Sequence, residues 1–322
     1  TDSGAVSVGR NFTATTDDNS GVIDMDTLEV NRAIALTTDG TGDATIVNDE
    51  DIKFATSTVR GDLTATATTG NIWDSGTLTI AGATTFITTA ADSNINLGSS
   101  GNAFSGSVTM QAGTGSNVAF GSIIFVDSEA VKIHTSAGTN GDLFINANTD
   151  GVAAVGGSLS ITAKSGNITQ SLPVTVGTTS SFTTTANNTT ITLSNTSNAF
   201  TGALTITTND DSNDRSYATI DGGTTALIIA TSVIDGNLTL TSGAAAGIID
   251  TGNVTVAGNL IATTNANSGV INMGTLKVDG TMALTTDGDG DATVVNMDDD
   301  IDFANSTVRG DLIATSTTGN II

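Results

Sequence analysis

The feature that most constrains the fold is an internal repeat. Residues 61–110 align without a gap with residues 157–206, at a spacing of 96 positions (157 − 61 = 96). The shared residues are apolar anchors together with Gly and Asn, and none is chemically reactive; they include Leu63 and Leu159, Asn71 and Asn167, Phe86 and Phe182, and Asn102 and Asn198. A fixed internal period is typical of repeat architectures, in which each unit packs on its neighbours.

A longer repeat relates residues 2–72 to residues 250–321. Leu36-Thr37-Thr38-Asp39-Gly40, for example, recurs as Leu284-Thr285-Thr286-Asp287-Gly288, and the second copy gains one residue after Asn296. We therefore expect residues 1–322 to form one continuous repeat array. Neither terminal sequence resembles the polar, atypical cap of a solitary solenoid. This favours end-to-end stacking, either on adjoining repeats or on other copies of the chain.

Short alternating runs predict β-strands throughout the chain. In runs such as Thr77–Ile80 and Asn253–Val256, aliphatic side chains share one face and Thr, Ser or Asn the other. No stretch sustains the helical period, so we expect an all-β fold without significant helix. Anchors that recur at fixed offsets over a long unit favour parallel stacking over hairpins. The sequence therefore predicts a parallel β-helix, or β-solenoid, with roughly 20–25 residues per turn.

The composition restricts the classes of partner. The chain has 33 acidic and 9 basic residues, for a net charge of −24, which argues against nucleic acid and anionic membrane surfaces as partners. It contains no cysteine, so disulfides and thiolate chemistry are excluded. No apolar run approaches membrane-spanning length, so membrane insertion is not expected.

The repeated motifs resemble the repeat arrays of the filamentous-haemagglutinin type, the giant secreted adhesins of bacteria. The similar pieces include Gly61-Asp62-Leu63-Thr64, Gly70-Asn71-Ile72 and Asn102-Ala103-Phe104-Ser105-Gly106, with their second copies between Gly157 and Gly202. The resemblance implies a right-handed β-helix shaft. It also implies an extracellular or cell-surface location and a role in adhesion or a matrix.

Two kinds of candidate site stand out, and turn chemistry offers an alternative explanation for both. The tripeptides Arg60-Gly61-Asp62 and Arg309-Gly310-Asp311 have the form of integrin-binding adhesion motifs. Asp287, Asp289 and Asp291 alternate with glycine, and such loops can place carboxylate and carbonyl oxygens around Ca²⁺. Calcium is therefore the one candidate ion, and no cofactor is required.

The sequence favours a structural subunit or shaft segment of an extracellular filament or adhesin. Its expected partners are copies of itself or adjoining repeats, and also cell-surface or matrix glycans. Catalysis is not expected, because His134 is the sole histidine and the acidic loops are duplicated with the repeat. A ligand-binding β-helix that recognises a polysaccharide or an ice surface is the alternative, and a polysaccharide lyase comes last. Trp73, the sole tryptophan, is interpreted as core or coil-rim packing.

Overall fold

The computed structural model describes residues 1–17, 19–113, 121–128, 131–134, 142–145, 153–209, 211 and 216–322. Within these residues the regular elements are β-strands and no helix is present, which confirms the predicted all-β class. The chain divides into two compact units, Thr1–Lys164 (unit 1) and Ser165–Ile322 (unit 2).

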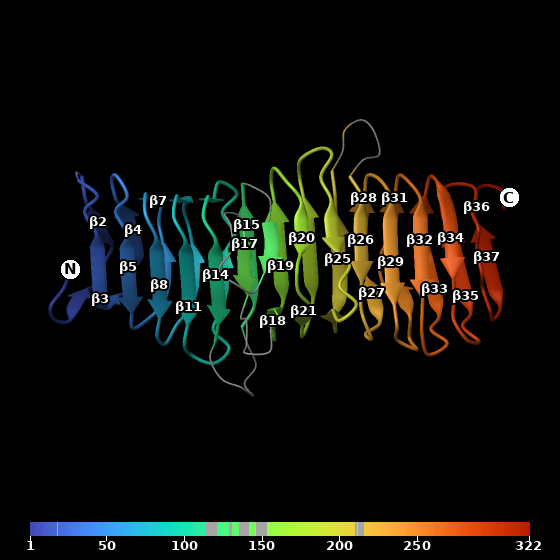
Figure 1. Ribbon diagram of the computed structural model, residues 1–322, viewed down its shortest axis with the longest axis horizontal. Coiled ribbons are helices and arrows are strands. Elements are labelled where there is room, and N and C mark those ends of the chain that lie inside the picture. The colour runs from blue at the N-terminus through green and yellow to red at the C-terminus, as the bar shows by residue number, and fades with distance from the viewer. Residues whose placement is uncertain are drawn as a thin grey trace. The chain divides into compact units, whose positions relative to one another are not determined.

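Unit 1 carries strands β1 to β19, drawn from blue to green in Figure 1. Their bounds are β1 (Val6–Val8), β2 (Phe12–Thr15), β3 (Ile23–Val30), β4 (Ala33–Thr37), β5 (Ala44–Asn48), β6 (Ile52–Phe54), β7 (Ser57–Val59), β8 (Leu63–Ala67), β9 (Ile72–Asp74), β10 (Leu78–Ile80), β11 (Thr84–Thr88), β12 (Ile95–Leu97), β13 (Ala103–Phe104), β14 (Val108–Ala112), β15 (Ile123–Asp127), β16 (Val131–His134), β17 (Asp142–Ile145), β18 (Ala153–Val155) and β19 (Leu159–Ala163).

Unit 2 carries strands β20 to β37, drawn from green to red in Figure 1. Their bounds are β20 (Ile168–Gln170), β21 (Val174–Val176), β22 (Ser180–Thr184), β23 (Ile191–Leu193), β24 (Ala199–Phe200), β25 (Ala203–Thr207), β26 (Ala218–Asp221), β27 (Leu227–Ile229), β28 (Ser232–Ile234), β29 (Leu238–Ser242), β30 (Ile248–Asp250), β31 (Val254–Val256), β32 (Leu260–Thr264), β33 (Ile271–Val278), β34 (Thr281–Thr285), β35 (Ala292–Asn296), β36 (Asp302–Phe303) and β37 (Leu312–Ser316).

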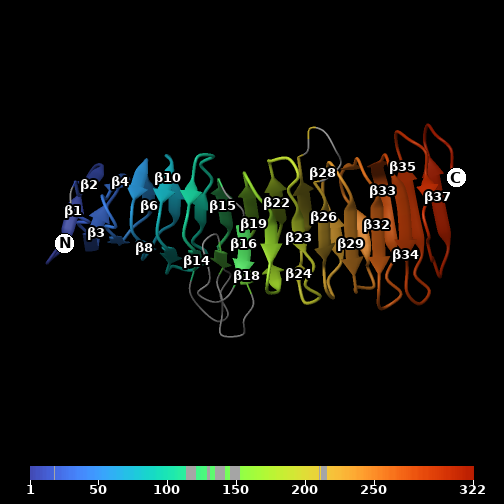
Figure 2. The ribbon, with the colours of Figure 1, turned by 45° about the horizontal axis from the view of Figure 1, so that its top comes forward.

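Parallel strands stack in register within each unit. In unit 1, β5, β8, β11 and β14 form one such stack, in which Ala44 pairs with Leu63, Leu63 with Thr84 and Thr84 with Val108. Paired residues of successive strands are between 19 positions (63 − 44) and 24 positions (108 − 84) apart in the sequence. In unit 2, β26, β29, β32 and β34 stack in the same way (Figure 2). Each unit is therefore a parallel β-solenoid with about the predicted number of residues per turn, here called a rung.

The internal repeat corresponds to the observed strands one for one. Adding 96 to the first residue of β8, β9, β10, β11, β12 and β13 gives the first residue of β19, β20, β21, β22, β23 and β24. Adding 248 likewise takes β1, β2, β3, β4 and β5 to β31, β32, β33, β34 and β35. Both repeats are thus repeats of structure. The single continuous array and the right-handed twist stay predictions.

The core of each unit lies between its stacked strands and contains lines of apolar side chains. In β8 and β11 every second residue is buried and the residues between are partly exposed, as a half-buried strand requires. Phenylalanines stack from rung to rung in unit 1, where the ring centroids of Phe54 and Phe86 lie 6.0 Å apart and those of Phe86 and Phe104 lie 6.2 Å apart. Both pairs meet edge to face, a favourable geometry for aromatic rings.

Buried asparagines hold the turns between strands. The Asn102 Oδ1 accepts a hydrogen bond from the Leu78 backbone N–H at 2.9 Å, and its Nδ2 donates to the Leu97 carbonyl at 3.2 Å. Asn198, its repeat partner in unit 2, accepts from the Val174 N–H at 2.8 Å in the same way. Because water does not reach these groups, the side-chain amide supplies the hydrogen bonds that the turn backbone cannot make.

Candidate functional site

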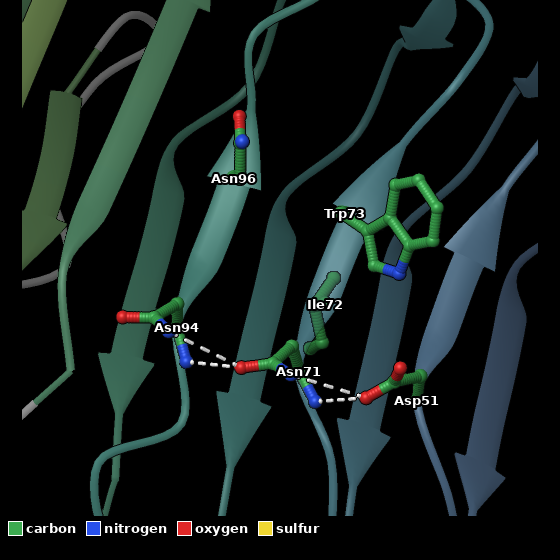
Figure 3. Close-up of a pocket in the computed structure, with 6 residues that line it drawn as sticks. All are labelled: Asp51, Asn71, Ile72, Trp73, Asn94 and Asn96. Atoms are coloured by element: carbon green, nitrogen blue, oxygen red, sulfur yellow. Dashed lines mark hydrogen bonds between the residues drawn. The ribbon is translucent and has the colours of Figure 1, made fainter.

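A ladder of polar side chains precedes four stacked strands of unit 1. Strands β6, β9, β12 and β15 are directly preceded by Asp51, Asn71, Asn94 and Ser122, respectively. The backbone N–H of Asn71 donates to Asp51 Oδ1 at 2.7 Å, and that of Asn94 to Asn71 Oδ1 at 2.8 Å (Figure 3). The backbone N–H of Ser122 donates to Asn94 Oδ1 at 2.7 Å. Each side chain thus satisfies the first N–H of the next rung.

The amides of this ladder keep hydrogen-bonding capacity for a ligand. Asn71 Nδ2 donates to Asp51 Oδ1 at 3.2 Å, and Asn94 Nδ2 donates to Asn71 Oδ1 at 3.4 Å. A carboxamide nitrogen carries two hydrogens, so one N–H of each amide makes no hydrogen bond to the described residues. Gly70 is required beside them, because a Cβ at this position would lie 2.3 Å from Asp51 Oδ1 and 2.5 Å from the Asp51 nitrogen.

Trp73 lies next to this ladder and faces outward. Its strand position pairs with Lys53 on one side and with Asn96 on the other. The Lys53 ammonium lies 4.5 Å from the centroid of the indole ring, a cation–π contact that orients the ring. The Trp73 side chain is nevertheless 37% exposed.

A shallow depression of about 380 Å³ is lined by Trp73, Asn96, Asn94, Asn71, Ile72 and Asp51. In Figure 3 the indole of Trp73 and the amide of Asn96 stand on opposite sides, with Asn71 and Asn94 below them. Asn96 makes no side-chain hydrogen bond to the part of the chain that the structure describes. The lining offers one aromatic ring and several carboxamides, which suits binding by stacking and hydrogen bonds.

Of the two positions expected for Trp73 from the sequence, core and coil rim, its exposure excludes the core. Comparison of the two repeats shows what the scaffold itself requires. Asn71 has a counterpart in Asn167, whose Oδ1 accepts from the Thr190 N–H at 2.8 Å, so the ladder belongs to the repeated scaffold. Trp73 corresponds to Thr169 and Asn96 to Thr192 (73 + 96 and 96 + 96). The fold therefore does not need tryptophan at this position, and its presence in one copy alone was the available signal.

The Arg-Gly-Asp tripeptides lie in turns between rungs. The Asp62 backbone N–H donates to Asp43 Oδ1 at 2.8 Å, and Asp62 Oδ1 in turn accepts from the Ala83 N–H at 2.7 Å. A Cβ on Gly61 would lie 2.5 Å from the Thr41 carbonyl, so this residue must be glycine. In the second tripeptide, Arg309, Gly310 and Asp311 repeat this arrangement, with the Asp311 N–H 2.7 Å from Asp291 Oδ1. Turn formation accounts for the glycines and aspartates, and adhesion through Arg60 or Arg309 stays a prediction.

Replacing Asp62 by alanine is expected to lower the free energy of unfolding by about 1 kcal/mol, because the Ala83 N–H loses its carboxylate partner. Arg60→Ala, the matched control two residues away, is expected to change it by less than about 0.5 kcal/mol. Urea unfolding followed by circular dichroism measures both. Equal effects of the two substitutions would contradict the structural role given to Asp62.

The acidic loop that contains Asp287, Asp289 and Asp291 is organised by its own hydrogen bonds. Gly288 has a φ of +58°, and the Gly290 N–H donates to the Asp287 carbonyl at 3.0 Å. The Asp289 N–H donates to Ser268 Oγ at 3.1 Å. Among the described residues, no group of three or more His, Cys, Asp or Glu side chains is placed to hold a metal ion. Calcium binding at this loop stays a prediction.

The outermost strand of unit 2 exposes an apolar side chain that its repeat counterpart buries. β37 pairs with β35, and its Leu312 is 45% exposed; the adjacent Ile313, at an outward position equivalent to Thr64, is 58% exposed. β8, the equivalent strand in unit 1, pairs with both β5 and β11, and its Leu63 is 1% exposed. Leu312 of β37 therefore stands at a position that is covered in the equivalent strand.

The first strands of unit 1 show the same contrast. Val6 and Val8 of β1 are partly exposed, whereas their equivalents Val254 and Val256 in unit 2 are fully buried. The unit 2 strand that contains them, β31, pairs with both β28 and β33.

The described residues contain no helix long and apolar enough to cross a membrane. His134 is the last residue of β16, and its side chain lies outside the described part of the chain.

Comparison with known proteins supports the repeat. Residues 41–111 and 134–207 match a family model described as repeats of unknown function (DUF5649). The two matched segments end 96 residues apart (207 − 111 = 96), which is the spacing of the internal repeat. Neither a curated protein nor a solved structure matches the chain. The chain is thus a repeat β-solenoid protein, and the filamentous-haemagglutinin type in particular stays a hypothesis.

Proposed function

We propose that this chain is a shaft segment of an extracellular or cell-surface filament or adhesin, and that its end rungs are covered by further rungs of the same kind. The observation that carries the proposal is that Leu312 on β37 is 45% exposed, whereas its equivalent on β8, Leu63, is 1% exposed. Covering apolar side chains with a next rung removes them from water and pairs the free strand edge. Adjoining repeats or a second copy can supply that rung.

Two internal strand pairs provide templates for the register of this contact. β2 is equivalent to β32, which pairs with β29 so that Leu238 faces Leu260 and Thr239 faces Ile261. β37 is equivalent to β8, which pairs with β11 so that Leu63 faces Thr84 and Thr64 faces Thr85. With β37 in the place of β29 in the first template, and β2 in the place of β11 in the second, Leu312 of one copy lies opposite Phe12 of the next, and Ile313 opposite Thr13. The two templates are therefore compatible with a single stacking register.

The surface chemistry is consistent with a shaft outside the cell. The net charge of −24 opposes non-specific association between copies of the chain. The resemblance to secreted adhesin repeats supports the extracellular location. Ice binding through outward threonines is less well supported, because Thr66 pairs with Val47 and Ile87 on its two sides.

Cross-linking between cysteine variants tests the proposed register. The natural chain contains no cysteine, so each introduced thiol is unique. A chain with Thr13→Cys is mixed with a chain with Ile313→Cys, and a short bismaleimide is added. Because the two side chains face outward on adjacent strands in the proposed contact, we expect a cross-linked dimer on a denaturing gel.

The matched control replaces Ile313→Cys by Thr241→Cys, an outward position on β29 that is paired on both sides. This mixture should give only background dimer. Equal dimer yields in the two mixtures would contradict end-to-end stacking in this register.

A further inference from the structure

We propose that the Trp73 depression binds one sugar residue of a neutral polysaccharide, with the indole as the stacking surface and Asn96, Asn94 and Asn71 as the hydrogen-bonding groups. The depression lies on unit 1 and takes no part in the end-to-end contact. The volume of the depression, about 380 Å³, is at the lower end of the range of ligand pockets, roughly 300–1,000 Å³, and is compatible with a single sugar ring.

The aromatic ring provides the apolar part of the site. A pyranose presents a flat patch of C–H groups on one face and hydroxyls around its edge, so it can lie on an indole while its edge remains polar. The cation–π contact with Lys53 at 4.5 Å holds the ring in place before a ligand arrives. A preoriented ring lowers the entropic cost of binding.

The carboxamides provide the polar part. Asn71 Oδ1 accepts a hydrogen bond from the Asn94 backbone N–H at 2.8 Å, and Asn94 Oδ1 accepts one from the Ser122 backbone N–H at 2.7 Å. These bonds fix the orientations of both side-chain amides. Each keeps one unused N–H, and Asn96 keeps both its donor and acceptor groups. Hydroxyl groups donate and accept, so they match such a mixed set better than a purely anionic or cationic ligand does.

The charge around the site selects against anionic glycans. Asp51 lines the depression, and the chain as a whole carries a net charge of −24. The ammonium of Lys53 is directed at the indole ring. A sulfated or carboxylated sugar would meet a repulsive field, whereas a neutral sugar would not.

The repeat supplies an independent argument for a role in binding. At the equivalent positions of the second copy, Thr169 and Thr192 stand in place of Trp73 and Asn96, and β20 and β23 still pair in parallel. Neither residue is therefore needed to build a rung. An exposed tryptophan that the scaffold does not require leaves apolar surface in water, which a ligand would cover.

The sole tryptophan of the chain makes fluorescence a specific probe, because all indole emission comes from Trp73. The full chain is titrated with cellotetraose, mannotetraose and chitotetraose, and with a heparin tetrasaccharide as the sulfated comparison. We expect at least one neutral oligosaccharide to change the emission and to protect the indole from acrylamide quenching. The heparin fragment should do neither.

Isothermal titration calorimetry with the active oligosaccharide then tests the individual residues. Trp73→Ala is expected to raise Kd about tenfold or more, and Asn96→Ala about threefold to tenfold. Tyr217→Ala removes an aromatic side chain that is 46% exposed in unit 2, and it should leave Kd unchanged. Unchanged urea midpoints for all three variants separate loss of binding from loss of folding.

Three results would overturn the proposal. The first is the absence of any fluorescence change with all the neutral oligosaccharides. The second is binding of the heparin fragment in preference to them. The third is a Trp73→Ala chain that folds normally and binds the active oligosaccharide as tightly as the natural chain.

Discussion

Replacing Asn198 by alanine is expected to lower the free energy of unfolding by about 3 kcal/mol. The side chain is buried, and its Oδ1 accepts hydrogen bonds from the Val174 N–H and from Gln170 Nε2, each at 2.8 Å. Its Nδ2 donates to the carbonyls of Leu193 and Asp221 at 3.1 and 2.9 Å. Alanine leaves these backbone groups without a partner, and an unpaired buried polar group costs more than a lost bond at the surface.

Asn195→Ala is the matched control, since the same chemical change is made three residues away. Asn195 Oδ1 accepts one exposed hydrogen bond, from the Ser197 N–H at 2.9 Å. Its loss is expected to cost less than about 1 kcal/mol, because water can replace the acceptor. Urea unfolding measures both variants, and a cost for Asn198→Ala no greater than that for Asn195→Ala would contradict the role given to the buried amide.

Phe86→Ala is expected to destabilise the protein by about 3–5 kcal/mol. Phe86 is fully buried, and its ring lies between those of Phe54 and Phe104. Truncation removes both ring contacts and leaves a cavity that stacked rungs cannot close without breaking their register. Phe86→Leu keeps much of the volume and should cost clearly less.

Hydrogen exchange locates the effect of Phe86→Ala along the chain. In a stacked repeat, stability depends mainly on contacts between neighbouring rungs. We therefore expect the largest loss of protection in β8, β11 and β14. Ile87→Ala, at the adjacent outward position, should leave protection in these strands nearly unchanged. Uniform loss of protection over both units would contradict this local coupling.

The sequence predicted the strands well because their signal is local. Alternation of aliphatic and polar residues at Thr77–Ile80 and Asn253–Val256 corresponds to β10 and β31, which begin one residue later. The two internal repeats likewise predicted which strands are equivalent. A period-two pattern fixes which side chains face the core, and stacking of equivalent positions then follows from the repeat.

The candidate site was harder to predict because it depends on neighbours that are distant in the sequence. The Trp73 depression joins residues at the starts of three stacked strands, β6, β9 and β12, and only the register shows that Lys53 and Asn96 flank the indole. The burial of Asn198 is similar, since its partners range from Gln170 to Asp221. A sequence shows that an asparagine recurs, but its hydrogen-bond partners emerge only from the folded chain.

The repeats nevertheless separate scaffold residues from others. Side chains found in both copies, such as Asn71 and Asn167, satisfy backbone groups of the next rung. Side chains found in one copy, such as Trp73, are free of that requirement. In a solenoid this difference between copies is a more useful guide to binding residues than composition, because the scaffold uses the same few residue types throughout.

Electron microscopy of the purified 322-residue chain at increasing concentration tests the stacking proposal most directly. We expect end-to-end assemblies that lengthen with concentration. A chain with Leu312→Lys, which places a charge on the apolar face of β37, should remain as single particles under the same conditions. Single particles for the natural chain at every concentration, indistinguishable from those of the variant, would contradict the proposal that its end rungs stack.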